Sequence, residues 1–208
     1  MIKFQEASNH QIAYSKVNYN LKSELFEYLQ ASGINLADLS KIKNSKRQIE
    51  WMTIRQLLLK IYPDFGDIVY DVHGKPHFTQ SNQHVSISHS HEMVALAINK
   101  DQITGIDIQL INDQIVRIKD KFLSESEQTH TSTDAIELSY YWSCKEALFK
   151  IYGKKDGFLK ANFFIDEIQF DEKGGIAKGR IKINHHESIH HLKMRRIDNY
   201  VMAYVVNS

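Results

Sequence analysis

Two helical segments of the sequence resemble each other, and each is followed by a set of short β-like runs. The segments are IEWMTIRQLLLKIY (49–62) and SYYWSCKEALFKIY (139–152), each with a Trp near its start and Lys-Ile-Tyr at its end. The runs after them alternate in polarity, are rich in β-branched and aromatic residues, and are broken by Gly, Asn or Asp. A helix followed by a meander, twice, predicts an internal duplication. Chance similarity between two helices of common composition is the alternative.

A duplication predicts an α+β fold made of two similar halves related by pseudo-twofold symmetry, each with a helix packed on an antiparallel meander. We place the boundary at residue 104, which gives an N-terminal half of residues 1–104 and a C-terminal half of residues 105–208. A cleft between the halves is where a ligand site is expected, because such sites favour domain interfaces.

Composition limits the class of protein. The chain has 208 residues, enough to bury a core, and its 26 basic residues nearly balance its 25 acidic ones. Neither a signal peptide nor a membrane-length apolar run is recognisable, so we expect a soluble cytoplasmic protein with no membrane partner and no need for nucleic acid. The single cysteine, Cys144, excludes an internal disulfide framework. The His-rich stretch 185–191 lies between strand-like runs and lacks a fixed ligand frame for a metal.

The second helical segment has an unusual pair of faces. An apolar stripe at helical spacing comprises Tyr140, Cys144, Ala147, Leu148 and Ile151. The opposite side carries Trp142, Lys145, Glu146, Phe149 and Lys150. Charges between large aromatics predict a helix covered on both sides, where a desolvated charge needs a partner, a metal or a ligand. The alternative is a surface ion pair between Glu146 and Lys150, which are spaced i, i+4.

A second acid lies on a mostly apolar strand. In TGIDIQL (104–110), alternation puts Ile106 and Ile108 on one face and Asp107 and Gln109 on the other. Asp107 is either a hydrogen-bonded structural residue or, with Glu146, the minimal protein contribution to a Mg²⁺ site whose other ligands are water and substrate phosphate.

Other motifs can meet anions. HVSISHSHE (84–92) groups Ser86, Ser88, His89 and Ser90 at a strand end, where short polar residues either bind an anion or satisfy a turn. Lys75 lies in a Gly-Lys-Pro turn upstream. Residues 41–60 contain six basic residues and one acid, which indicates either a solvated helix face or a phosphate-binding surface.

The motifs, taken in order, resemble the phosphopantetheinyl transferase superfamily, in particular its long, surfactin-synthetase-activating type. The matching elements are Gly74-Lys75-Pro76, SISHS (86–90), GIDI (105–108), KFLSESE (121–127) and WSCKEALFK (142–150). The resemblance spans about residues 40 to 155. Trp-x-x-Lys-Glu-Ala-x-x-Lys after GIDI is its most specific part.

The resemblance implies a Mg²⁺-dependent, holo-[acyl-carrier-protein] synthase type of enzyme. It would transfer the 4′-phosphopantetheine arm of coenzyme A to a serine of an acyl or peptidyl carrier protein and release adenosine 3′,5′-bisphosphate. The implied metal ligands are Asp107 and Glu146, and the implied catalytic residues are Glu146, as acceptor of the serine proton, and Lys150, at the α-phosphate. The residues implied to bind coenzyme A are Arg47, Lys75, Pro76, Ser88 and His89.

One position departs from the family pattern. Many members carry a second acid two residues after the Asp, and this chain has Gln109. A neutral amide holds Mg²⁺ less well than a carboxylate, so Gln109 is expected to reach the metal through water or not at all.

The sequence leaves the carrier open, and we expect a monomer because one chain supplies both sides of the cleft. A catalytically silent coenzyme A or nucleotide-binding protein and a nucleic-acid-binding module are the other functions considered.

Overall fold

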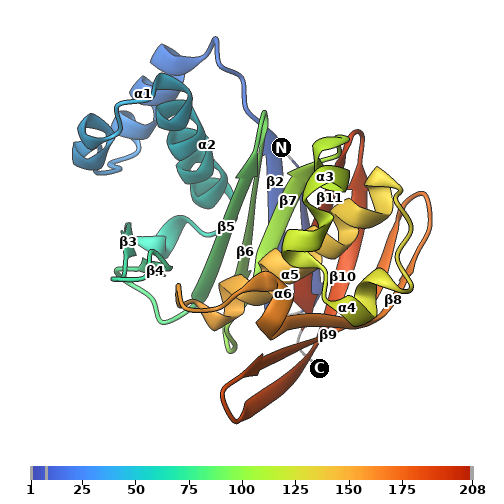
Figure 1. The fold of residues 1–208 in the computed structure, drawn as a ribbon. Coiled ribbons are helices and arrows are strands. Elements are labelled where there is room, and N and C mark those ends of the chain that lie inside the picture. The colour runs from blue at the N-terminus through green and yellow to red at the C-terminus, as the bar shows by residue number, and fades with distance from the viewer. Residues whose placement is uncertain (1, 8, 207–208) are drawn as a thin grey trace.

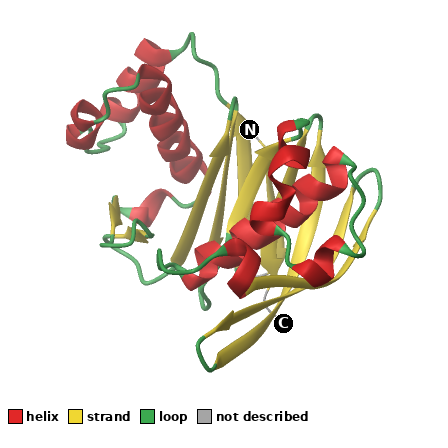
Figure 2. Cartoon of the chain, viewed as in Figure 1, coloured by secondary structure: helices red, strands yellow, loops and turns green. Residues whose placement is uncertain are grey.

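The structure is a computed structural model that describes residues 2–7 and 9–206. Two antiparallel sheets, of six and five strands, carry helices on their outer faces (Figures 1 and 2). The predicted α+β class with two similar halves is confirmed. No described helix combines the length and the apolar character needed to cross a bilayer.

The first half contains six strands and two long helices. The elements are β1 (Ile2–Ala7), β2 (His10–Lys16), α1 (Lys22–Ala31), the 3-10 helix η1 (Ala37–Lys41), α2 (Ser45–Ile61), η2 (Pro63–Phe65), β3 (Ile68–Tyr70), β4 (Pro76–Phe78), β5 (His84–Ser90) and β6 (Met93–Asn99). Asn44 caps α2 by accepting a hydrogen bond from the Arg47 amide.

The second half contains five strands around one long helix. The elements are β7 (Ile106–Leu110), α3 (Gln114–Phe122), α4 (Glu125–Gln128), α5 (Ala135–Tyr152), α6 (Leu159–Asn162), β8 (Phe163–Phe170), β9 (Gly174–Ile183), β10 (His186–Ile197) and β11 (Tyr200–Val206). Asp134 caps the start of α5, and Gly153, in the left-handed conformation, ends it.

The two sheets repeat one topology. The strand before each long helix pairs with the last of the four strands after it, giving the orders β2-β6-β5-β4-β3 and β7-β11-β10-β9-β8. The repeat therefore includes a strand before each helix, in addition to the helix and meander recognised in the sequence. The first sheet has one further strand, β1, which pairs with the outer edge of β2. The predicted boundary at residue 104 falls in the connection between β6 and β7.

Three buried clusters hold the layers together. One lies between α2 and the first sheet, one between α5 and the second sheet, and one between the sheets. Alternation decides which strand residues enter which cluster: Ile106 and Ile108 of β7 point between the sheets, so Asp107 points toward α5. This confirms the predicted alternation along GIDI.

Serine hydroxyls join the two sheets. β7 is the edge strand of its sheet, and an edge leaves backbone N–H groups without strand partners. The amides of Ile106, Ile108 and Leu110 donate hydrogen bonds to the hydroxyls of Ser86, Ser88 and Ser90 on β5, at 3.1, 3.3 and 3.1 Å. The SISHS motif thus satisfies the edge of β7 and fixes it beside β5.

Candidate active site between the halves

Asp107 and Lys150 form the centre of the candidate site. Asp107 is buried on β7, and its Oδ1 accepts hydrogen bonds from the Lys150 ammonium at 2.9 Å and from the Ser88 hydroxyl at 2.8 Å. The Lys150 ammonium also donates to the carbonyl oxygen of Ile106 at 2.7 Å. Among the described residues, Lys150 therefore forms its ion pair with Asp107 of β7. The sequence also allowed an i, i+4 pair between Lys150 and Glu146.

The second oxygen of Asp107 is left without a donor. Among the described residues, no group hydrogen-bonds to Asp107 Oδ2, although this atom is buried. A buried carboxylate oxygen without a partner carries a desolvation cost, which a bound cation would remove.

Glu146 adds a second carboxyl group near Asp107. The pKa of Glu146 is raised from 4.5 to about 7, chiefly by burial and then by the Asp107 carboxylate, with a smaller opposing effect of Lys150. Glu146 comes near because α5 packs tightly on β7: a side chain at Gly105 would collide with the carbonyl oxygen of Ala147. The glycine of GIDI therefore permits the close approach of helix and strand.

These two carboxyl groups fit a divalent cation. Oxygen ligands and few protein groups suit Mg²⁺, which keeps several waters or substrate oxygens. The described residues hold no cluster of three or more Asp, Glu, His or Cys side chains, so the chain would offer two carboxylates here. Gln109, expected to reach the metal through water or not at all, donates its side-chain amide to the carbonyl of Leu110 at 3.0 Å.

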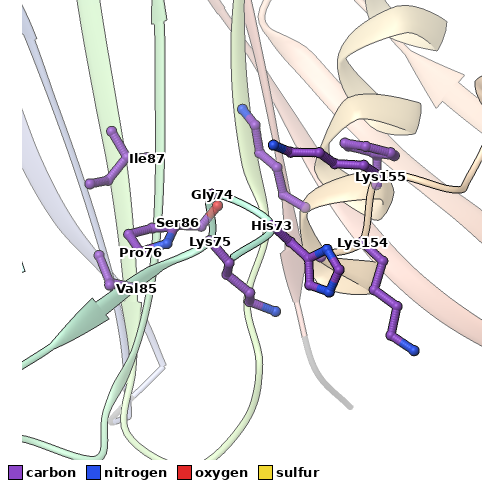
Figure 3. A pocket seen from close by; sticks show the side chains of 12 residues that line it. His73, Gly74, Lys75, Pro76, Val85, Ser86, Ile87, Lys154 and Lys155 are labelled. Atoms are coloured by element: carbon purple, nitrogen blue, oxygen red, sulfur yellow. The ribbon is translucent and has the colours of Figure 1, made fainter. Parts of the chain in front are cut away.

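A basic pocket opens beside Lys150 (Figure 3). One wall comes from the first half and the other from the end of α5 and the loop after it. Its lining residues are His73, Gly74, Lys75, Pro76, Val85, Ser86, Ile87, Phe149, Lys150, Gly153, Lys154 and Lys155. Four lysines and no acid line the described walls, which suits a phosphate-bearing ligand.

Lys75 connects the two walls of the pocket. Asp71 shapes its turn by accepting hydrogen bonds from the backbone amides of His73 and Lys75. The Lys75 ammonium reaches across to the carbonyl of Ile151 at 3.1 Å, at the C-terminal end of α5, where a cation is favourable. Burial lowers the pKa of Lys75.

The other expected coenzyme A residues lie in different surroundings. Ser88 is buried. Its hydroxyl donates a hydrogen bond to Asp107 and accepts one from the Ile108 amide, so in this structure Ser88 positions Asp107. His89 is exposed at the end of β5, and Arg47 is exposed in the first turn of α2. These two lie near each other, since Arg47 lowers the pKa of His89 after the larger effect of burial.

The aromatic side of α5 is covered, as expected from the sequence. Trp142 packs edge-to-face on Phe122, with ring centroids 5.2 Å apart, and Phe149 packs on Phe163 at 5.7 Å. Lys145 is fully buried and pairs with Glu127 at 2.5 Å. The charges on this side of the helix therefore have two different surroundings. Lys145 pairs with Glu127 inside the second half, whereas Glu146 and Lys150 lie toward β7.

Three basic side chains of the pocket, and the burial of one in the basic stretch, were not predicted from the sequence. These are His73, Lys154 and Lys155, which line the pocket. The sequence signal that could have predicted the two lysines is GKK, directly after the helix. Arg55, counted among the basic residues of 41–60, is buried against Trp51 and pairs with Asp67 at 3.5 Å. A solvated helix face is therefore the wrong description for Arg55.

Comparison with known families matches the second half of the chain. A family model described as the 4′-phosphopantetheinyl transferase superfamily matches residues 103–205. These residues form a domain of that superfamily. The phosphopantetheinyl transferase domain includes Asp107, Glu146 and Lys150, whereas Lys75 and His89 lie outside the matched range. Membership supports a transferase that uses coenzyme A and acts on carrier proteins. Among curated proteins, no sequence matches this chain.

Proposed function

We propose that the protein transfers the 4′-phosphopantetheine group of coenzyme A to a serine hydroxyl of an acyl or peptidyl carrier protein in a Mg²⁺-dependent reaction. The observation that carries the proposal is the buried Asp107 carboxylate beside a pocket lined by lysines. One of its oxygens is bound to Lys150, and the other has no hydrogen-bond partner among the described residues. A cation bound to Asp107 and a phosphate held in this pocket would be neighbours.

The reaction joins the carrier serine to the pantetheine phosphate. The serine oxygen forms a bond to that phosphorus, the bond to the oxygen of adenosine 3′,5′-bisphosphate breaks, and the serine proton leaves. When bound by Asp107 and Glu146, Mg²⁺ would neutralise charge on the diphosphate.

The chain's own residues have distinct parts in this reaction. Glu146, with a pKa near 7, is suited to accept the serine proton directly or through water. Lys150 neutralises the leaving phosphate, and Lys75 and Pro76 line the wall that receives the nucleotide. Arg47 and His89 lie where they can bind its further phosphate. Ser88 holds Asp107 in place.

The wider expectations are part of the same proposal. We propose the long, surfactin-synthetase-activating type, acting in the cytoplasm. We propose that it acts as a monomer because residues of both halves line one pocket. Sedimentation at several concentrations tests the monomer, and fractionation of cells tests the location.

The transfer is tested by incubating the protein with coenzyme A, Mg²⁺ and a panel of apo carrier proteins. Intact mass of the carriers and release of adenosine 3′,5′-bisphosphate are the readouts. The proposal expects both products with at least one carrier. Tight binding of coenzyme A without either product, across acyl, aryl and peptidyl carriers, would favour the catalytically silent binding protein.

A further inference from the structure

Glu50 is a buried acid on α2 that the proposed chemistry does not use. Its Oε2 accepts a hydrogen bond from Arg47 Nη1 at 3.0 Å and lies 3.8 Å from His89 Nε2. Its Oε1 lies 3.2 Å from the Tyr19 hydroxyl, which is also 2.8 Å from the carbonyl of His91. Glu50 therefore connects the start of α2, the end of β5 and the segment before α1.

One carboxylate oxygen lies between a guanidinium and an imidazole. Arg47 and His89 come from different elements, so the local chain geometry does not fix the distance between them. The Oε2 atom of Glu50, which both side chains face, brings them together. Both side chains keep an open side, with 52% of Arg47 and 37% of His89 exposed. Arg47 uses one guanidinium nitrogen for Glu50, which leaves other donors directed at solvent.

The position suits a small anion with two negative charges. Arg47 lies in the first turn of a helix of 17 residues, where the helix dipole favours anions. Lys150 and Asp107 both act on the pKa of His89, so this place is adjacent to the candidate active site. His89 lies on the same strand as Val85, Ser86 and Ile87, which line the basic pocket, so a ligand that fills the pocket is expected to extend a second phosphate group toward it.

We propose that Glu50 is a positioning residue that selects coenzyme A over dephospho-coenzyme A, by holding Arg47 and His89 together as a two-sided clamp for a phosphate monoester. The inference rests on the proposed function, since it takes coenzyme A as the ligand. Glu50 does not touch the ligand itself.

A purely electrostatic role of Glu50 predicts the opposite result. If the carboxylate only neutralised Arg47, then removing its charge would strengthen the binding of an anionic ligand. If it positions the clamp, Glu50→Gln frees Arg47 and His89 to separate, and the monoester loses paired, charge-assisted hydrogen bonds. Glu50→Asp adds a second test because it keeps the charge and shortens the reach.

The experiment measures the dissociation constants of coenzyme A and dephospho-coenzyme A by calorimetry. For both E50Q and E50D we expect coenzyme A to bind at least about fivefold more weakly and dephospho-coenzyme A to change less than about twofold. Asp38→Asn is the matched control, because it removes one acid that pairs only with Lys41 among described salt bridges, and it should change neither constant. Circular dichroism establishes that each variant is folded.

Three results would overturn the inference: tighter binding of coenzyme A by E50Q, equal weakening of both ligands, or wild-type-like selectivity of E50D. A wild-type protein that binds both ligands equally would overturn it as well, while leaving the proposed function standing. A wild-type protein that binds neither ligand would reject the proposed function together with the inference.

Discussion

Lys150 of α5 and Asp107 of β7 form an ion pair of 2.9 Å that links the two chemical parts of the site. Lys150 lines the basic pocket, and Asp107 carries a buried oxygen that no described group hydrogen-bonds. A phosphate in the pocket and a cation on the carboxylate would therefore be neighbours. This arrangement depends on the close packing of α5 against β7 at Gly105.

Removing the Lys150 ammonium should affect turnover more than binding. Lys150→Ala is expected to lower kcat by at least about a hundredfold, while the Kd of coenzyme A weakens by less than about tenfold, since the charge on the leaving phosphate grows in the transition state. Lys60→Ala is the matched control, because Lys60 holds the corresponding place in α2 and is exposed. Equal losses in kcat and affinity would make Lys150 a binding residue only.

Ser88 and Ser90 both bond the backbone of β7, but replacing them should affect activity differently. The Ser88 hydroxyl hydrogen-bonds both the β7 backbone and Asp107, whereas among the described residues the Ser90 hydroxyl hydrogen-bonds the β7 backbone and the His91 ring. Each substitution by Ala should lower the free energy of unfolding by about 1 kcal/mol. Only Ser88→Ala should lower kcat, by about tenfold, because Asp107 then loses a donor that orients it. Comparable activity losses in the two variants would refute the positioning role of Ser88.

The sequence predicted the parts of the site that local periodicity determines. Alternation placed Asp107 opposite Ile106 and Ile108, and helical spacing placed Glu146 and Lys150 on one side of α5; the structure confirms both directions. These predictions succeeded because strand and helix periods fix directions without knowledge of partners.

Contacts between distant segments could not be predicted in the same way. Glu127 is one of several acids that Lys145 could have met, and only the packing of α4 beside α5 selects it. From the sequence, Ser86, Ser88 and Ser90 are expected either to bind an anion or to satisfy a turn, because nothing in their spacing reveals that β7 lies alongside β5 as an edge strand. Similarly, the burial of Arg55 depends on the placement of Asp67 and Trp51.

Glu146 should make the stability of the metal-free protein depend on pH. Its pKa is raised from 4.5 to about 7, so the folded chain holds this proton more tightly than the unfolded chain, and stability falls as pH rises through this interval. At 1.36 kcal/mol per unit, Glu146→Gln should raise the free energy of unfolding by roughly 2–3 kcal/mol more at pH 8 than at pH 4.5. Urea unfolding in chelator measures this difference. A gain that is the same at both pH values would show that the pKa of Glu146 is not raised in the folded protein.

Gln109 should contribute little to metal-dependent rate. Its amide nitrogen is directed to the carbonyl of Leu110, and a neutral amide binds Mg²⁺ weakly. Gln109→Ala is expected to cost less than about tenfold in kcat/KM, near 1.4 kcal/mol, whereas Asp107→Ala costs far more. Gln109→Glu should be tolerated and lower the Mg²⁺ concentration required. A folded Gln109→Ala variant as impaired as Asp107→Ala would make Gln109 a direct metal ligand.

In the proposed function, Asp107 supports divalent-ion-dependent transfer from coenzyme A to a carrier serine. The most direct measurement is the intact mass of an apo carrier after incubation with coenzyme A, in Mg²⁺ and in excess chelator, using wild-type protein and the near-isosteric Asp107→Asn variant. We expect the carrier to gain one phosphopantetheine group only with wild-type protein in Mg²⁺. Full modification in chelator, or by folded Asp107→Asn protein, would contradict the account.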